Sequence, residues 1–284
     1  MDRGGAAPVN QPRLARSRSL VRTLAYALRR VATPAGSLVA QVPVLELSFR
    51  LPIRSGLARH LYKYRSYEPA IGNWILDAFP IGGGGLFVDI GANFGWYSCL
   101  FSRLAGGTGR VVAFEPEPGN FGLLEANLLR NGCRNVSALR EGLADRPGEL
   151  ELHLYKASNP GRHSLLPTPG GETVRVPVVA LDDRLAALGL AERPVDLIKI
   201  DIEGFELSAL RGASATLSRC RNMVIEYSPD LMRRAGIEPS ALIDLLDSSG
   251  MQVSMFGETG MVEVDATALR TLTGQADLLW QRLT

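Results

Sequence analysis

The chain has 284 residues, of which 46% are hydrophobic and 21% charged, so it is long enough to bury a full core. The formal net charge of +2 excludes a strong attraction of the whole molecule to nucleic acid, and no apolar run reaches the roughly 20 residues that span a bilayer. Three cysteines without a CxxC pair favour a reducing compartment over secretion. We therefore expect a cytoplasmic protein, with a peripheral position at a membrane face as an open alternative.

The first 80 residues are basic and differ in composition from the rest. Residues 1–16 contain few large apolar groups and predict a disordered tail. In residues 17–32, Leu20, Leu24 and Leu28 recur at helical spacing while arginines occupy other faces, which predicts a basic amphipathic helix. This helix either packs on the main domain or contacts anionic lipid or an acidic partner. We expect a basic helical extension over residues 17–80.

A second helix is predicted for "YEPAIGNWILDAF", residues 67–79, before Pro80 and four consecutive glycines. Tyr67 and Glu68 at its start are candidates to close a pocket, and helix capping is the alternative. The main domain is expected over residues 81–284.

From residue 86 onward, short apolar runs alternate with helical patterns, which is typical of a parallel sheet with helices on both faces. The strand candidates are 86–90, 110–114, 136–140, 195–200 and 222–227. The helix candidates are 96–104, 118–131, 181–188, 204–211 and 239–248. "GELELHLY" and "ETVRVPVVAL" predict an inserted hairpin or flap, and three further strands near the C-terminus are expected to close the sheet edge.

The turn "VDIGANFG" follows the first strand of this sheet, where open α/β folds usually hold a ligand. Gly91 and Gly95 permit tight backbone angles, and Asp89 offers a hydrogen-bond acceptor. The next strand ends in Glu115, 20 residues after Gly95, where such folds place an acid on a ribose. The spacing is not GxGxxG, and Asp89 would repel a pyrophosphate, so the pattern favours S-adenosylmethionine over a nicotinamide cofactor.

Four segments resemble the FkbM-type methyltransferases: "FVDIGANFGWYS", "VVAFEPEPGNFGLLEANL", "GLADRPGELEL" and "DLIKIDIEGFELSALRG". The resemblance runs from about residue 67 to residue 280. It implies the α/β class I (Rossmann-like) methyltransferase fold, a seven-stranded mostly parallel sheet whose last strand is antiparallel. It also implies methylation of hydroxyl oxygens on sugars or natural products with S-adenosylmethionine. Gly142 departs from the family pattern, where an alanine is more usual, and the first 55 residues lie outside it.

The resemblance further implies a cofactor site. Glu115 would hold the ribose, while Glu141 and Gly142 would lie near the adenine, although an ordinary surface position is an equal explanation for Glu141. The methionine half would be lined by Asp89, Gly91, Asn93 and Gly95, with Asp201 beside the sulfonium.

"DLIKIDIEGFE" places Lys199 and Asp201 two residues apart, on the same side of a buried strand, where both need partners. Methyl transfer to a hydroxyl needs an acceptor for the hydroxyl proton. The candidates for this role are Asp201, Glu203, Glu226 and, in the flap segment "NPGRHSLLP", His163. Lys199 is expected to keep Asp201 ionised rather than to act as the base.

His60 and His153 are expected to be surface or packing residues. Mg²⁺ held by clustered acids is an alternative that we do not favour, and we predict no metal site.

These patterns predict an S-adenosylmethionine-dependent O-methyltransferase acting on a sugar, glycolipid or secondary metabolite. The acceptor would be a small molecule or a glycan, and no nucleic acid is expected, because the NPPY-type tetrad of base methyltransferases is absent. An NAD(P)-dependent oxidoreductase and a non-catalytic nucleoside-binding module are the alternatives. The sequence does not determine the oligomeric state.

Overall fold

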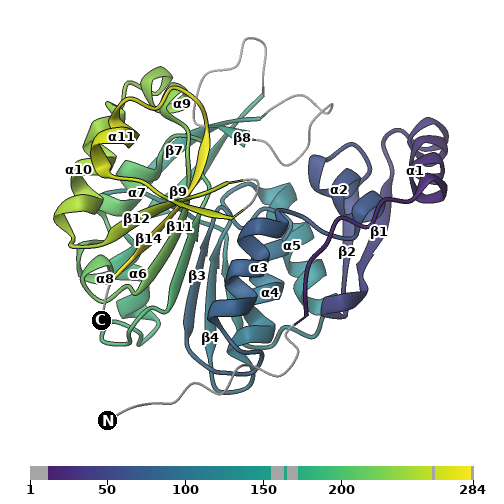
Figure 1. Ribbon diagram of the computed structural model, residues 1–284, viewed down its shortest axis with the longest axis horizontal. Helices are drawn as coiled ribbons and strands as arrows, with labels where there is room; N and C mark the ends of the chain where they lie inside the picture. Colours follow the sequence, from purple (N-terminus) through teal and green to yellow (C-terminus); the bar gives the residue numbers. More distant parts are fainter. Residues whose placement is uncertain (1–11, 155–162, 165–171, 258–259, 283–284) are drawn as a thin grey trace.

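The computed structural model describes residues 12–154, 163–164, 172–257 and 260–282. Its centre is an eight-stranded sheet with helices on both faces (Figure 1). The order of the strands in the sheet is β13 (Met261–Glu263), β12 (Gln252–Phe256), β14 (Ala276–Gln281), β11 (Asn222–Tyr227), β10 (Leu197–Ile200), β3 (Leu86–Ile90), β4 (Arg110–Phe114) and β5 (Val136–Leu139).

The five strands from β5 to β11 are parallel, and β14 is antiparallel to both of its neighbours. This confirms the class I methyltransferase arrangement, to which the short strand β13 adds an eighth member. From β3 the chain runs outward to β4 and β5, and later returns to β10 on the other side of β3. The strand order therefore reverses between β3 and β10, and a ligand site is expected at their carboxyl ends.

Two apolar cores lie against the two faces of the sheet, because successive side chains of a strand point to opposite faces. Phe87 of β3 belongs to one core, and its neighbour Val88 belongs to the other. Figure 1 shows α3 (Pro69–Ala78), α4 (Trp96–Ala105) and α5 (Pro118–Arg130) on the first face. The second face carries α6 (Leu181–Ala187), α7 (Glu206–Arg211), α8 (Ser214–Ser218) and α10 (Pro239–Ser248), and two short helices, α9 (Pro229–Arg234) and α11 (Ala266–Arg270), lie nearby.

The N-terminal extension is only partly helical, which corrects the expectation from the sequence. It contains α1 (Leu20–Ala32), β1 (Ser37–Val42), the 3-10 turn η1 (Pro43–Leu45), β2 (Leu47–Pro52) and α2 (Gly56–Tyr64). The strands β1 and β2 form an antiparallel hairpin in which buried and exposed residues alternate. Asn127 on α5 supports this hairpin: its amide accepts from Arg50 N at 2.7 Å and donates to Arg50 O at 3.2 Å.

Residues 12–16 also differ from the expected disordered tail. Leu14 is buried against Gly72, and its backbone N and O both bond the side chain of Asn73, at 2.7 and 2.9 Å. One large apolar side chain and one matching amide are enough to fix this stretch. Residues 1–11 lie outside the described part of the chain.

The expected inserted hairpin is present as β7 (Gly148–Leu154) paired antiparallel with β9 (Thr173–Val179). Together with β6 (Gly142–Leu143) and β8 (His163–Ser164), these strands form a second sheet in the order β6-β9-β7-β8. Within the described ranges, no helix has both the length and the apolarity needed to cross a bilayer.

Candidate active site

A pocket of about 540 Å³ lies at the carboxyl ends of β3, β4, β10 and β11. Its volume falls in the range of roughly 300–1,000 Å³ that is usual for ligand sites. Its walls come from three parts of the chain: the turns that follow the central strands, the inserted strands β7 and β9, and the N-terminal extension.

The turn after β3 forms one wall with Gly91 and Asn93. Both residues have left-handed backbone angles, with φ of 80° and 52°. A Cβ on Gly91 would lie 2.1 Å from the carbonyl oxygen of Asp201, so only glycine fits between the two turns.

Glu115 follows β4 and faces the same pocket. The backbone N–H of Asn93 donates to one of its carboxylate oxygens at 2.8 Å, and that of Glu117 donates to the other at 3.0 Å. These bonds fix the orientation of the carboxylate while leaving further lone pairs for a ligand. Burial raises the pKa of Glu115 to about 7, against the lowering effect of the two backbone donors.

Glu141 lies on the wall at the end of β5 and pairs with Arg184 at 2.5 Å. Its Oε1 makes this ion pair, whereas its buried Oε2 has no hydrogen-bond partner among the described residues. A buried acceptor without a donor is a place where a ligand N–H fits. Gly142 lines the pocket next to it, and a Cβ there would come 3.1 Å from Val178.

Three predicted site residues lie behind the pocket wall. Asp89 is 1% exposed and accepts a hydrogen bond from Ser98, and burial raises its pKa to about 6. A Cβ on Gly95 would meet Leu124 at 2.8 Å, so this glycine allows α4 and α5 to pack closely. Asp89 and Gly95 shape the turn, and neither of them lines the pocket. Lys199 is the third.

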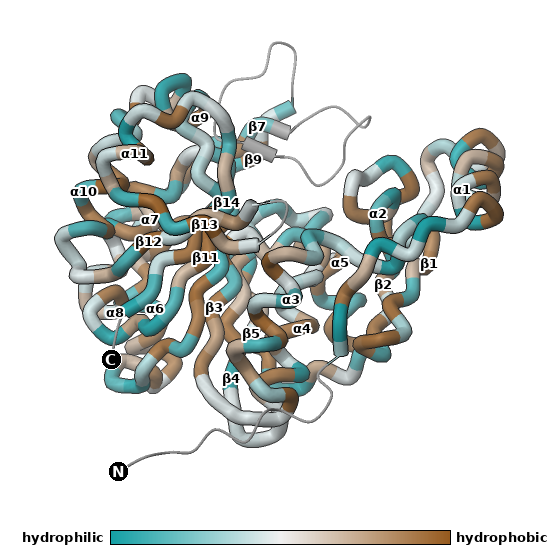
Figure 2. The backbone as a smooth tube through the Cα atoms, viewed as in Figure 1, coloured by the Kyte–Doolittle hydropathy of each residue, from teal (hydrophilic) through white to brown (hydrophobic). Residues whose placement is uncertain are grey.

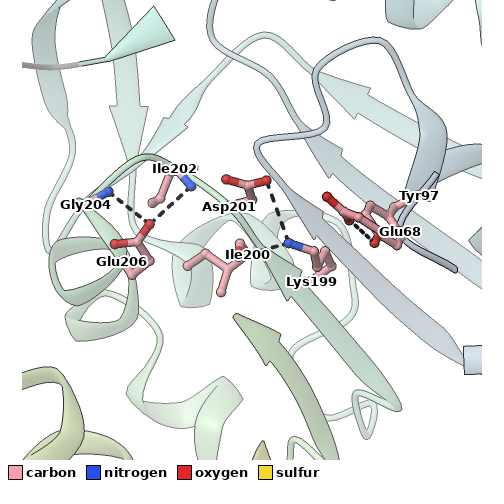
Figure 3. A network of polar contacts seen from close by, with 8 residues as sticks. All are labelled: Glu68, Tyr97, Lys199, Ile200, Asp201, Ile202, Gly204 and Glu206. Atoms are coloured by element: carbon pink, nitrogen blue, oxygen red, sulfur yellow. Dashed lines mark hydrogen bonds and ion pairs between the residues drawn. The ribbon is translucent and has the colours of Figure 1, made fainter. Parts of the chain in front are cut away.

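Lys199 is the buried cation of the site, with 2% of its side chain exposed. Its Nζ lies 3.8 Å from Asp201 Oδ2 and 5.4 Å from the centre of the Tyr97 ring. In Figure 3 the ammonium points towards Asp201, with the hydrogen-bonded pair of Glu68 and Tyr97 nearby. Burial lowers the pKa of Lys199, but the surrounding carboxylates raise it more, so that the group stays protonated. These carboxylates belong to Asp201, Glu68, Asp277 and Glu226.

Glu226 ends β11 and also faces the pocket. Burial, reinforced by the charge of Asp201, raises its pKa to about 9, although Lys199 acts in the opposite direction. Asp277, its register partner on β14, has a pKa raised to about 6 by burial. At neutral pH the site therefore contains the ammonium of Lys199 and a protonated Glu226.

The turn after β10 carries Asp201 and Glu203, both of which line the pocket. Glu206 holds this turn from behind by accepting from the backbone N–H groups of Ile202 at 3.3 Å and Gly204 at 3.1 Å (Figure 3). Glu203 adopts φ of 55°, a left-handed angle for which a side chain is seldom suited. Glu206, the third acid of "DIEGFE", thus fixes the backbone of the turn, while Asp201 and Glu203 face the cavity.

Comparison with known protein families identifies the family to which this chain belongs. The methyltransferase FkbM domain matches residues 89–253, which is more than half of the chain. The chain belongs to the FkbM methyltransferase family. This confirms the resemblance drawn from the sequence motifs.

Two curated relatives are methyltransferases. Hexuronic acid methyltransferase AglP of Haloferax volcanii is 28% identical over 167 residues, covering 59% of this chain and 63% of that protein. Methyltransferase sdnD of Sordaria araneosa is 30% identical over 198 residues, covering 59% of this chain and 73% of that protein. The match thus spans slightly less than two thirds of the Haloferax protein. The crystal structure of methyltransferase FkbM from Methylobacillus flagellatus KT has a TM-score of 0.44 at 20% identity, covering 69% of this chain and 43% of that one.

The FkbM domain match includes the turns after β3, β4, β5 and β10, but it leaves out one whole wall of the pocket. That wall comes from the N-terminal extension and includes Arg16, Arg59, His60, Tyr67 and Glu68. Tyr67 and Glu68 both line the pocket, while Glu68 also stands at the N-cap position of α3 and accepts a hydrogen bond from Tyr97.

His60 packs within the extension, as the sequence predicted: its Nδ1 bonds the carbonyl oxygen of Gly56 at 2.9 Å, and its ring centre lies 5.8 Å from that of Tyr67. It also lines the pocket, which no local sequence pattern indicated. His163 has its backbone in β8, and its side chain lies outside what the structure describes.

Among the residues that the structure describes, no cluster of three or more His, Cys, Asp or Glu side chains has a geometry suited to a metal ion.

Proposed function

We propose that this FkbM-family protein is an S-adenosylmethionine-dependent O-methyltransferase whose acceptor is a hydroxyl of a sugar, glycolipid or secondary metabolite. The observation that carries the proposal is the joint placement of Glu115 and Asp201 in one pocket at the point where the strand order reverses. Glu115, an oriented acid after β4, suits ribose hydroxyls, and Asp201, an acid after β10, suits a reacting hydroxyl.

The described residues fit the cofactor. Glu115 would accept hydrogen bonds from the ribose, and the unpartnered Oε2 of Glu141 would accept from the adenine amino group. Gly91 and Asn93 would approach the methionine half. The bound cofactor supplies a methyl group on a positively charged sulfur, which the acidic surroundings of Asp201 would favour.

Residues of the chain then accept the proton of the acceptor hydroxyl. The acceptor oxygen gains the methyl group, and its proton moves to the carboxylate of Asp201. Lys199, which stays protonated, lies 3.8 Å from this carboxylate and orients it before the transfer. Glu226 carries a proton at neutral pH and can donate a hydrogen bond to the acceptor. Glu203 and His163 remain alternative bases.

The wall from the N-terminal extension supports an acidic acceptor. Arg16 and Arg59 bring two guanidinium groups to the rim of the pocket, and His60 adds a third basic side chain. Guanidinium groups pair well with carboxylates and phosphates. The Haloferax relative is named a hexuronic acid methyltransferase, which is consistent with this class of acceptor.

Isothermal titration with S-adenosylmethionine, S-adenosylhomocysteine and NADH, without added metal, tests the cofactor. We expect binding of the two sulfur nucleosides and none of NADH. Binding of NADH alone would instead support the oxidoreductase. Transfer of a labelled methyl group is then compared between uronic acid sugars and the matching neutral sugars, and activity in EDTA tests the disfavoured Mg²⁺ requirement.

A further inference from the structure

The helix α1 has its apolar side turned away from the protein. The large apolar residues Leu20, Val21, Leu24, Leu28 and Val31 are between 64% and 83% exposed. At 100° per residue these five positions fall on one side of the helix. Figure 1 places α1 at the outer end of the N-terminal extension, far from the large sheet, and Figure 2 shows its apolar stretches in brown.

The opposite, polar side of α1 is the side that contacts the protein. Tyr26 is buried and donates a hydrogen bond to the carbonyl oxygen of Ile53 at 2.6 Å. Arg22 donates to the carbonyl oxygen of Lys63 at 3.0 Å, and the guanidinium of Arg29 lies 5.8 Å from the centre of the Tyr62 ring. These contacts fix the rotation of the helix. A surface helix normally does the reverse and buries its apolar side.

The surroundings of this apolar stripe are strongly basic. Residues 1–66 contain 12 basic and 2 acidic side chains, whereas the rest of the chain contains 19 basic and 27 acidic ones. Beneath α1, a hollow is lined by Arg30, Arg54, Arg59 and Lys63, and no acidic residue of the described chain lines it. The small net charge of the whole protein therefore hides a division into a positive end and a negative body.

We propose that α1 docks the protein on the surface of a bilayer that contains anionic lipid. The five apolar side chains enter the boundary between headgroups and acyl chains, and the net positive charge of residues 1–66 attracts the anionic headgroups. An exposed apolar stripe within a basic segment is the combination that such surfaces bind.

Pairing with a second copy of the chain fits the same face less well. It would bring two positive ends together, and the 13 residues of α1 make fewer than two heptads, whereas helix pairing of the coiled-coil type is sustained over at least three. Charge complementarity thus selects anionic lipid. The hollow beneath α1 adjoins the candidate active site, because Arg59 lines both of them.

The test is flotation of the full chain with vesicles of phosphatidylcholine alone or mixed with phosphatidylglycerol. We expect binding to the mixed vesicles, much weaker binding to the neutral ones, and a loss of binding as salt rises. The double substitution Leu24→Gln/Leu28→Gln should weaken binding at least about tenfold, because each leucine loses its apolar contribution.

Leu129→Gln provides the matched control, since Leu129 is 85% exposed on α5, outside the docking face. It should bind vesicles like the unaltered protein, and thermal unfolding should be the same for both variants. Equal flotation of the double variant, or no preference for the mixed vesicles, overturns the proposal. The proposal is also overturned if light scattering shows a dimer that the double substitution abolishes, because the apolar side of α1 would then bind a second copy of the chain. Cofactor titration on the same samples reports separately on the proposed function.

Discussion

Gly91 and Asp201 touch through their backbones: a Cβ on Gly91 would stand 2.1 Å from the carbonyl oxygen of Asp201. The turns after β3 and β10 are therefore built as one unit, and the proposed cofactor and acceptor sides of the site share this contact.

Gly91→Ala should consequently disturb both stability and the site. The left-handed angle alone costs on the order of 1–3 kcal/mol, and the clash forces the two turns apart. We expect a lower unfolding midpoint and weakened binding of S-adenosylhomocysteine, measured by urea titration and calorimetry. Gly122→Ala, in α5 with open space around it, should leave both unchanged or raise stability slightly. A fully stable Gly91→Ala protein would contradict this reading of the turn.

Glu115→Ala should weaken cofactor binding by about 1.5–3 kcal/mol, because a charge-assisted contact to the ribose is lost. Titration calorimetry with S-adenosylhomocysteine measures this directly. Glu125→Ala removes an exposed acid of α5 and should have no effect. Unchanged affinity in Glu115→Ala would remove Glu115 from the site.

Asp201→Asn should lower turnover by roughly 100-fold or more while changing cofactor affinity little, because general-base catalysis contributes about that much. The measurement is single-turnover methyl transfer alongside calorimetry. Glu203→Gln and His163→Gln are compared under the same conditions. If either of them loses more turnover than Asp201→Asn, the proton goes to that residue instead.

Lys199→Met should destabilise the protein by about 3–5 kcal/mol, because it leaves the carboxylates around it without their buried cation. Urea unfolding gives the free energy of unfolding. Adding Asp201→Asn removes the carboxylate nearest to Lys199 and should restore part of the loss. Additive losses in the double variant would show that the two groups do not interact.

Glu226 should make stability depend on pH. Its pKa is raised from the ordinary 4.5 to about 9, so the folded protein holds the proton more tightly than the unfolded chain between these values. Its contribution is fully present below pH 4.5 and is lost as pH rises to about 9. Glu226→Gln, which resembles the protonated group, should therefore gain stability relative to the unaltered protein as pH rises through this window. A flat difference, as expected for the exposed control Glu125→Gln, would contradict the buried, protonated state.

The sheet could be predicted almost residue by residue, because each central strand is an apolar run buried on both faces. β3 and β11 have the predicted bounds, and β10 is two residues shorter at its start. The hairpin of β1 and β2 was missed although its residues alternate, because the whole of residues 17–80 was predicted as a helical extension.

Site residues that belong to a sequence motif could be predicted, whereas those brought together by the packing of distant segments could not. Asp201 and Glu115 were found from strand ends, and both face the pocket. The pocket position of His60 was not predicted, because it depends on how α2 packs in the folded chain, which no local pattern contains. Asp89 was expected to accept hydrogen bonds at the strand end, and it accepts one from Ser98 behind the pocket wall.

The strand β14 is the last in chain order, yet it lies between β11 and β12. During synthesis β12 emerges before the neighbour that joins it to the sheet, so the pairing of β12 with β14 cannot be completed until residue 281 is available. The sheet is thus closed by a strand inserted last into a gap. A ribosome-bound nascent chain halted before residue 276 would hold an exposed strand edge, which is a surface that chaperones and aggregation both recognise.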